Sequence, residues 1–339
     1  MFIKHVKEAI RECTIAGEDP FDNFSLSNIS EAVGDDVFSN LLKNTANKSM
    51  VKAFDTFPAT WKSIVNQPLG NRKDFKTNTL IRIDEFTRLE KVKKYTETDM
   101  ETIGEAAGTY KVETYEKGYQ MNRQDIINDD LGAFMKFPQS QGRAAARTID
   151  KFVWDFINNG TSTSLVFDGT ALFTSGHGNI ITTSPLSTST LTSARYQLGQ
   201  MKLNSEDNDD KLGLKPTFLV VPTSLVSLAE RIVTAQKGLA QTANNDGNIW
   251  KNLIILEVPW LTDAGTEATA DWYLMASPSQ IDTIQIDFLK GQSIPQTLTR
   301  IENSKDNYDF NSNSRAFKTR YEFGGKVVDY RFIIKGDAV

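Results

Sequence analysis

The sequence predicts an α+β fold, in which helical blocks and strand-rich blocks follow one another along the chain. Short apolar or alternating runs, such as Thr109–Tyr115 and Phe218–Val221, indicate strands. Apolar residues that recur at helical spacing between Ile149 and Ile157 indicate the clearest helix. With 339 residues, the chain is long enough for two or three lobes rather than one.

The composition is that of an ordinary globular protein and excludes several functional classes. The 38 basic and 43 acidic residues give a net charge of −5, which argues against a dedicated reader of duplex DNA. The single cysteine, Cys13, excludes an intrachain disulfide framework and fits a reducing compartment. One cysteine and two histidines are too few for a usual zinc site. No apolar run approaches 18 residues, so we expect no transmembrane helix and a chain that is soluble and cytoplasmic when synthesised.

The first 120 residues predict an arm followed by an extended hairpin. Residues 1–60 carry short helical stripes with too little apolar area to order alone. Strands are predicted at Leu80–Ile83 and Thr109–Tyr115, with the charged stretch Asp84–Gly108 between them. This stretch is either a solvated surface loop or an arm that reaches a neighbouring subunit.

The next block, residues 121–189, contains the clearest helix. We expect it to run from Ser140 to Asn159, about 30 Å at 1.5 Å per residue, with Pro138 just ahead of it. Phe152 and Phe156 are among the residues that recur at helical spacing, and we expect them on its buried face. Gly160 is expected to end the helix in the left-handed conformation.

Residues 190–276 predict a separate α/β lobe, and residues 277–339 are predicted to be mainly strands. In the lobe, a helix from Thr190 to Leu203 is expected to precede the strand Phe218–Val221, after which Pro222 begins another helix. The expected strands that follow are Leu253–Val258, Trp272–Ala276, Ile281–Phe288 and Thr297–Ile301. The last two strands, Arg315–Phe323 and Lys326–Ile334, are predicted to form a hairpin across Gly324-Gly325.

No catalytic, cofactor or metal site is predicted. Gly104–Gly108 lacks the spacing of a dinucleotide-binding loop, and no P-loop, GxSxG or HExxH motif occurs. The acidic cluster Glu206, Asp207, Asp209 and Asp210 lacks the glycine and the final glutamate of a calcium loop, so a solvated turn is favoured. His177 has no nucleophile in a recognisable context, and we expect it to hydrogen-bond the backbone of its own loop.

The charged stretch offers one candidate contact site. Lys91, Lys93 and Lys94 form a basic run, and acidic neighbours that include Glu97 and Glu101 balance it. A solvated, salt-bridged face is the simplest interpretation. The same mixture of charges suits a contact with another subunit, where charge complementarity sets the register.

Several segments resemble major capsid proteins of tailed bacteriophages, and most closely the branch that includes the Mu-type major head subunit. The resemblance rests on four blocks in a fixed order: MNRQDIINDDLGAFMKFPQSQGRAAARTIDKFVWDFINN, DGTALFTSGHGN, LKPTFLVVPTSL and SKDNYDFNSNSRAFKTRYEFGGKVVDYRFIIKG. The resemblance covers about residues 50–335.

The resemblance implies the tailed-phage capsid fold and names its parts. It implies an N-terminal arm at 1–60, an extended loop at 61–120, a peripheral domain with a spine helix at 121–189 and an axial domain at 190–276. The return strands at 277–339 would complete the axial and peripheral domains. No acidic coiled coil precedes residue 60, so scaffold and protease are expected to be separate products unless the chain is already trimmed.

The resemblance also implies a function, which is that of a structural, non-enzymatic shell subunit. It would form pentamers and hexamers of an icosahedral head that encloses double-stranded DNA without sequence specificity. The implied partners are a scaffold or prohead protease, a portal and head-decoration proteins, with no membrane and no cofactor. The protein would be found in the virion, and in the host cytoplasm during assembly. The alternatives are an encapsulin-like shell around a cargo protein and a hydrolase with an unrecognised site.

Overall fold

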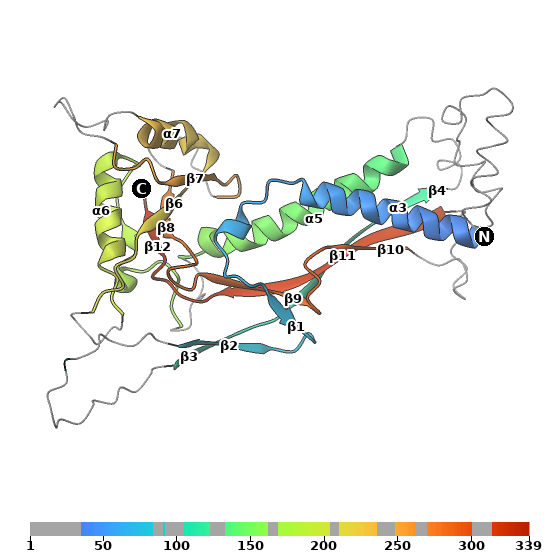
Figure 1. Ribbon diagram of the computed structural model, residues 1–339, viewed down its shortest axis with the longest axis horizontal. Coiled ribbons are helices and arrows are strands. Elements are labelled where there is room, and N and C mark those ends of the chain that lie inside the picture. The colour runs from blue at the N-terminus through green and yellow to red at the C-terminus, as the bar shows by residue number, and fades with distance from the viewer. Residues whose placement is uncertain are drawn as a thin grey trace. The chain divides into compact units, whose positions relative to one another are not determined.

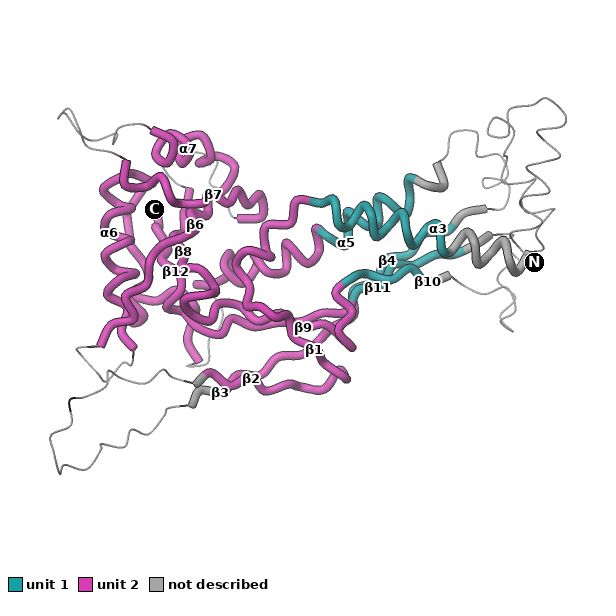
Figure 2. The backbone as a smooth tube through the Cα atoms, in the orientation of Figure 1, with its two compact units in different colours: residues 1–57, 115–146, 294–321 teal, residues 58–114, 147–293, 322–339 magenta. Residues whose placement is uncertain are grey.

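The computed structural model describes residues 35–83, 91, 105–122, 133–161, 169–203, 210–235, 248–261, 270–299 and 314–338. The chain forms two compact units, coloured separately in Figure 2. Unit 1 comprises residues 1–57, 115–146 and 294–321, and unit 2 comprises residues 58–114, 147–293 and 322–339. Helices and strands occur in both units, as the sequence predicts (Figure 1).

Unit 1 combines helices with a three-stranded group. Its elements are α3 (Asp35–Asp55), the first part of α5 (Ala133–Asn158), most of β4 (Glu113–Asn122), β10 (Gln296–Thr299) and the first part of β11 (Ser314–Val327). Both β10 and β4 pair with β11. The two helices approach closely at Gly142, where a Cβ would lie 2.2 Å from the backbone oxygen of Met50. Phe54 of α3 packs edge-on against Tyr321 of β11, with ring centroids 5.7 Å apart.

Helix α3 is longer than its apolar stripe predicts. The stripe extends from Phe38 to Ala46, whereas the helix continues to Asp55. Ala46, Met50 and Phe54 are buried within the described part of the chain. This part of the expected arm is therefore ordered against its own chain, and residues 1–34 lie outside the described residues.

Helix α5 begins at Ala133, seven residues before the expected start at Ser140, and Pro138 lies inside it. Pro138 is the sixth residue of the helix, and a proline there removes the hydrogen bond that an amide at this position would donate to the carbonyl of residue 134. Ile149, Val153 and Ile157 are buried as predicted. Phe152 and Phe156 are only half-buried, and Phe152 packs edge-on against Phe156 at 5.0 Å and against Phe323 at 5.2 Å. The prediction placed them too deep, because they lie at the border of the buried face.

The predicted left-handed cap at Gly160 is wrong. The glycines with positive φ among the described residues are Gly169, Gly178, Gly213 and Gly291. At Gly160 a Cβ would lie 2.6 Å from the ring of Phe173, and the Gly160 carbonyl accepts a hydrogen bond from the Phe173 amide at 3.0 Å. The glycine is required here by a close contact rather than by a turn.

Unit 2 contains a five-stranded sheet in the order β5-β12-β8-β6-β7. The strands are β5 (Ile180–Ile181), β12 (Ile333–Gly336), β8 (Trp272–Ala276), β6 (Pro216–Val221) and β7 (Ile254–Glu257). The pairs β5–β12 and β6–β7 are parallel, and the pairs with β8 are antiparallel. Helix α6 (Thr188–Gly199) packs on β12 and β8, and α7 (Val226–Thr234) packs on β6 and β7 (Figure 1).

The helices of this sheet follow the sequence closely. Leu191, Ala194 and Leu198 are the buried residues of α6, as the helical spacing predicts. Ser187 and Thr190 form a reciprocal capping box, which explains why α6 begins at Thr188. Pro222 precedes a 3₁₀ turn, η3 (Thr223–Leu225), so the expected helix begins with this turn and α7 follows.

The remaining strands of unit 2 are β1 (Gly70–Arg72), β9 (Ile284–Leu289) and the end of β11. Strand β1 is parallel to β9, and β9 is antiparallel to residues 323–327 of β11. A short 3₁₀ turn, η1 (Trp61–Ser63), precedes β1. The buried carboxylate of Asp150 accepts hydrogen bonds from the Thr60 and Trp61 amides and from Trp260 Nε1, and so holds this segment against α5.

The predicted hairpin across Gly324-Gly325 is wrong. Strand β11 runs through both glycines, which face Asp287 and Ile286 of β9. Neither glycine has a positive φ. A Cβ at 324 would lie 2.1 Å from the Lys111 carbonyl oxygen, and one at 325 would lie 2.4 Å from the carbonyl oxygen of Gln285. The glycines allow neighbouring backbone to approach, and the chain turns later, before β12 joins the other sheet.

Candidate functional site

The extended hairpin predicted from the sequence has a described base in unit 2. Strands β2 (Asn78–Ile83) and β3 (Glu105–Tyr110) pair antiparallel, from Asn78 opposite Tyr110 to Ile83 opposite Glu105. The prediction of the first strand is confirmed. The second predicted strand, Thr109–Tyr115, is divided between β3 and β4. We call the β2–β3 pair the ribbon.

The ribbon has one exposed and one inward face. Paired residues Ile81 and Ala107 are both exposed, as are Thr79 and Thr109. Ile81 is 53% exposed, which is unusual for a large apolar side chain on a strand. Two strands alone are marginally stable in water, so contacts of the inward face must hold the ribbon in place.

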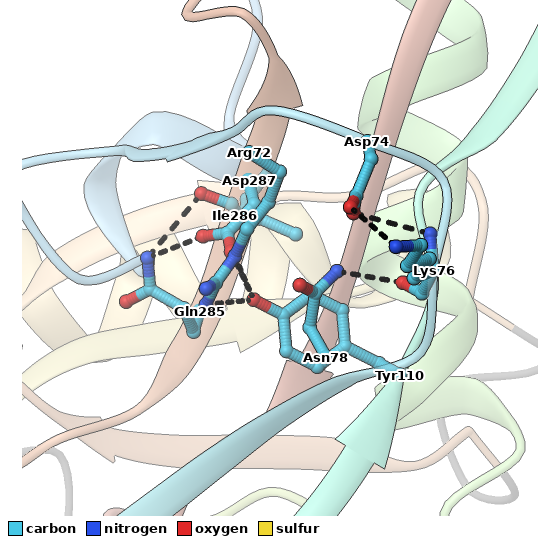
Figure 3. Close-up of polar contacts among 8 residues, drawn as sticks. All are labelled: Arg72, Asp74, Lys76, Asn78, Tyr110, Gln285, Ile286 and Asp287. Atoms are coloured by element: carbon cyan, nitrogen blue, oxygen red, sulfur yellow. Dashed lines mark hydrogen bonds and ion pairs between the residues drawn. The ribbon is translucent and has the colours of Figure 1, made fainter.

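The main contact is a group of polar side chains around Asp287 of β9, shown in Figure 3 and called here the Asp287 cluster. It comprises Arg72, Tyr110, Gln285 and Asp287. Arg72 Nε and the Tyr110 hydroxyl both donate to Asp287 Oδ2, and Gln285 Nε2 donates to Oδ1 at 2.8 Å. Arg72 Nη2 also donates to the Tyr110 oxygen at 2.6 Å. The side chain of Asp287 is fully buried, and a buried charge requires partners. These donors compensate the charge of the carboxylate.

The backbone of β1 leaves room for this cluster. A Cβ at Gly70 would lie 1.7 Å from Asp287 Oδ1, so any other residue there would displace the carboxylate. Burial, and next the hydrogen bond to Asp287, raises the pKa of Tyr110 far above its usual value. Tyr110 therefore remains a protonated hydrogen-bond donor at physiological pH.

A second contact lies toward the other end of β2. Arg82 Nη1 is 3.6 Å from Asp329 Oδ2, and Asp329 is buried. Arg331 Nε donates to both oxygens of Asp329 at 3.0 Å, and Arg331 Nη1 donates to the carbonyls of Lys202 and Leu203. Asp329 is thus held mainly by Arg331, and Arg82 adds a longer ion pair.

The structure places one of the five residues predicted as a contact site. Lys91 is exposed. Lys93, Lys94, Glu97 and Glu101 lie outside the described residues. Whether these five side chains meet another subunit therefore stays a prediction.

The other candidate sites have structural roles or lie outside the described part. His177 Nδ1 is 3.1 Å from the Leu172 carbonyl oxygen, and its ring stacks on Tyr330 at 3.8 Å, so it binds its own loop as expected. The described part of the GEAAG segment is strand β3. In the acidic cluster only Asp210 is described, and it is buried. Within the described residues, no group of three or more His, Cys, Asp or Glu side chains could hold a metal ion.

Sequence reasoning missed the Asp287 cluster. Asp287 interrupts the apolar run Ile284–Leu289, and such a charge in a buried strand signals a paired partner. Its partners Arg72 and Tyr110 are 215 and 177 residues away in sequence, so no local pattern could identify them.

None of the helices in the described part of the chain is long and apolar enough to cross a membrane.

A family model described as phage capsid protein matches residues 105–336. No curated protein sequence matches this chain. The capsid of cyanophage P-SCSP1u is similar in structure, with a TM-score of 0.53 and 11% identity, over 82% of this chain and 88% of that chain. A virus-like particle from Pyrococcus furiosus has a TM-score of 0.51 and 9% identity, over 87% of this chain and 98% of that chain. The procapsid of bacteriophage JBD30 has a TM-score of 0.49 and 15% identity, over 90% of this chain and 76% of that chain.

Proposed function

The chain belongs to the phage capsid protein family, and from this premise we propose that it is the major subunit of an icosahedral head. It forms pentamers and hexamers that close around double-stranded DNA. The observation that carries the proposal is the family match across residues 105–336, since it spans elements of both units. A structural, non-enzymatic role suits a chain whose polar clusters serve the fold. Subunits joined by repeated heterologous contacts close into rings.

The proposed organisation follows the parts of the fold. Residues 1–60 act as the N-terminal arm, 61–120 as the extended loop and 121–189 as the peripheral domain with α5 as spine helix. Residues 190–276 act as the axial domain, and 277–339 return to complete both domains. The sheet of unit 2 supports this last assignment, because β12 pairs with β8.

We further propose that the extended loop contacts a neighbouring subunit. Lys91, Lys93 and Lys94, with Glu97 and Glu101, form the charged part of this contact. The exposure of Ile81 and of Lys91 supports the proposal, since both leave side chains available outside the subunit. Complementary charges would set the register of the contact more than its affinity.

The proposed partners follow from the same role. They are a scaffold or prohead protease, a portal and head-decoration proteins, and the protein assembles in the host cytoplasm before it resides in the virion. Contact with the packaged DNA is without sequence specificity. A net charge of −5 fits this, because dense packaging requires no concentrated basic face on the subunit.

The oligomeric state tests the proposal directly. The purified full-length chain is expected to give pentamers, hexamers, tubes or shells by size exclusion with light scattering and by negative-stain microscopy. Many weak contacts per subunit make such assemblies stable through multivalency. A monodisperse monomer over a wide concentration range would refute the proposal.

Charge reversal tests the contact site. Changing Lys91, Lys93 and Lys94 together to Glu is expected to leave the subunit folded but to impair shells at low salt. Each exposed pair contributes only about 0–1 kcal/mol, but the shell repeats the loss at every copy. The control reverses three other exposed lysines, Lys62, Lys215 and Lys251, which changes the net charge equally. Normal shells from the first variant would show that the loop faces solvent.

A second candidate, a shell around a cargo protein, is favoured by the similarity to the virus-like particle. That similarity shows the fold alone, and the family match favours the phage role. The contents of shells isolated from the native source distinguish the two. Nuclease-protected DNA of uniform length supports a phage head, and a single enclosed protein species supports the alternative.

A further inference from the structure

We propose that the Asp287 cluster sets the orientation of the ribbon, with the Tyr110 hydroxyl as the positioning group. The inference rests on the proposed function, since it concerns the hairpin that would reach a neighbouring subunit. To that function it adds a specific role for the Asp287 cluster, which fixes the direction in which the hairpin leaves the subunit.

The position of each residue supports this role. Tyr110 is the last residue of β3 and lies opposite Asn78, the first residue of β2, so it marks the base of the ribbon. Arg72 is the last residue of β1, and Asp287 lies opposite Gly70 in the paired strand β9. The cluster therefore joins the base of the ribbon to the β1–β9 pair, as Figure 3 shows. In the part of the chain that the structure describes, neither β2 nor β3 pairs with a further strand.

The hydrogen bonds of the cluster are better suited to fixing the orientation of the ribbon than to adding stability. A buried ion pair often contributes little more to stability than apolar side chains of equal volume. Hydrogen bonds to a carboxylate, however, require particular distances and angles, whereas apolar surfaces can slide. Gln285 holds Asp287 Oδ1, and this oxygen occupies the space that a side chain at position 70 would fill.

The ion pair between Arg82 of the ribbon and Asp329 is longer than the contacts of the Asp287 cluster. The distance of 3.6 Å between Arg82 Nη1 and Asp329 Oδ2 exceeds that of a hydrogen bond. Asp329 already has bidentate contacts with Arg331. Loss of the Tyr110 hydroxyl should therefore release the base of the ribbon, although Arg82 still attracts β2.

The test compares hydrogen exchange in the parent and the Tyr110→Phe variant, each as the full-length chain under conditions where it is not assembled. The variant keeps the buried ring and the Arg72–Asp287 pair. Amide exchange in residues 78–83 and 105–110 is expected to rise about tenfold or more, since a hydrogen bond to a charged group is lost. Exchange in β8, residues 272–276, is expected to stay unchanged.

Tyr119→Phe is the matched control. The Tyr119 hydroxyl is buried and has no hydrogen-bond partner among the residues that the structure describes, so its removal should change exchange in neither segment. Unchanged exchange in the ribbon of Tyr110→Phe would overturn the proposal. An equal rise in β8 would also overturn it, because Tyr110 would then serve the whole unit rather than the ribbon.

Assembly gives a separate readout. If the parent forms shells, Tyr110→Phe is expected to give fewer closed shells and more open or irregular particles, although its subunit remains folded. Closed shells in normal yield would refute the link between the cluster and assembly. If the parent chain never assembles, the proposed function is refuted. The hydrogen-exchange result then tests the role of the Asp287 cluster by itself.

Discussion

Two parts of unit 2 are held in place by different physical means. At the centre of the five-stranded sheet, every residue of β8 and β12 is buried. The ribbon has an exposed face with Ile81 and an inward face held by the Asp287 cluster. The first depends on apolar area removed from water, and the second on a few directional contacts to one carboxylate.

This difference separates stability from orientation. Apolar burial provides most of the folding free energy and tolerates small shifts of side chains. A polar cluster provides less net free energy but defines one geometry. In the proposed shell, where each subunit meets identical copies, both properties are needed in different places: a sheet that keeps the subunit folded and a ribbon with one fixed orientation.

The largest expected effect is at the centre of the sheet. Trp272 is fully buried, donates from Nε1 to the Ser184 carbonyl at 2.8 Å, and its ring would be 2.1 Å from a Cβ at Gly336. Trp272→Ala is expected to lower the free energy of unfolding by about 4–5 kcal/mol, because it leaves a large cavity and an unpaired carbonyl. Denaturant unfolding measures the loss.

The control for this change lies in the same unit. Tyr196 of α6 is 69% exposed, so Tyr196→Ala should change the unfolding free energy by less than about 0.5 kcal/mol. A Trp272→Ala chain as stable as the Tyr196→Ala chain would contradict the view that apolar burial holds the sheet.

A smaller loss is expected when the Asp287 cluster loses its carboxylate. Asp287→Ala leaves the Arg72 guanidinium and the Tyr110 hydroxyl without their shared acceptor, at a cost of about 3 kcal/mol. Asp287→Asn keeps the volume and one acceptor oxygen and should lose less. Urea titration of both variants checks the order, and equal stability of parent and Asp287→Ala would show that the cluster contributes no net free energy.

The sequence predicted the sheet better than the ribbon for a physical reason. Phe218–Val221 and Trp272–Ala276 are continuous apolar runs, and a strand buried on both faces requires that pattern locally. The ribbon is held by contacts such as Tyr110–Asp287, whose partners are 177 residues apart in the chain. No local periodicity reports such a pairing.

The wrong predictions at glycine and proline residues have a common reason, which is that each residue type has more than one structural use. A Gly-Gly pair suits a tight turn, yet Gly324 and Gly325 lie inside β11, where they admit the Lys111 and Gln285 carbonyls. Gly160 makes room for Phe173 in the same way. Pro138 lies within α5 rather than ahead of it. For the three glycines, the deciding neighbour belongs to the tertiary structure and not to the local sequence.

The smallest expected effect concerns an exposed ion-pair group in unit 1, which should behave unlike the buried Asp287 cluster. Glu116 of β4 binds Lys318 and Arg320 of β11, and its hydrogen bond with Lys318, followed by that with Arg320, lowers its pKa below the usual value. The stability that these contacts add is therefore complete above the unfolded pKa of about 4.3 and is lost as the pH falls through the lower folded pKa. Glu116→Gln should cost less than about 1 kcal/mol at pH 7, since all three side chains are about one third or more exposed. Urea unfolding at pH 7 and at pH values below the carboxylate range should show this difference shrinking with acid, and 1 M salt should shrink it at pH 7 as well.

Glu113→Gln, at an exposed position of the same strand, is the control. A Glu116→Gln loss of several kcal/mol that persists in salt would mean that this surface group resembles the Asp287 cluster, and that exposure does not separate the two kinds of contact.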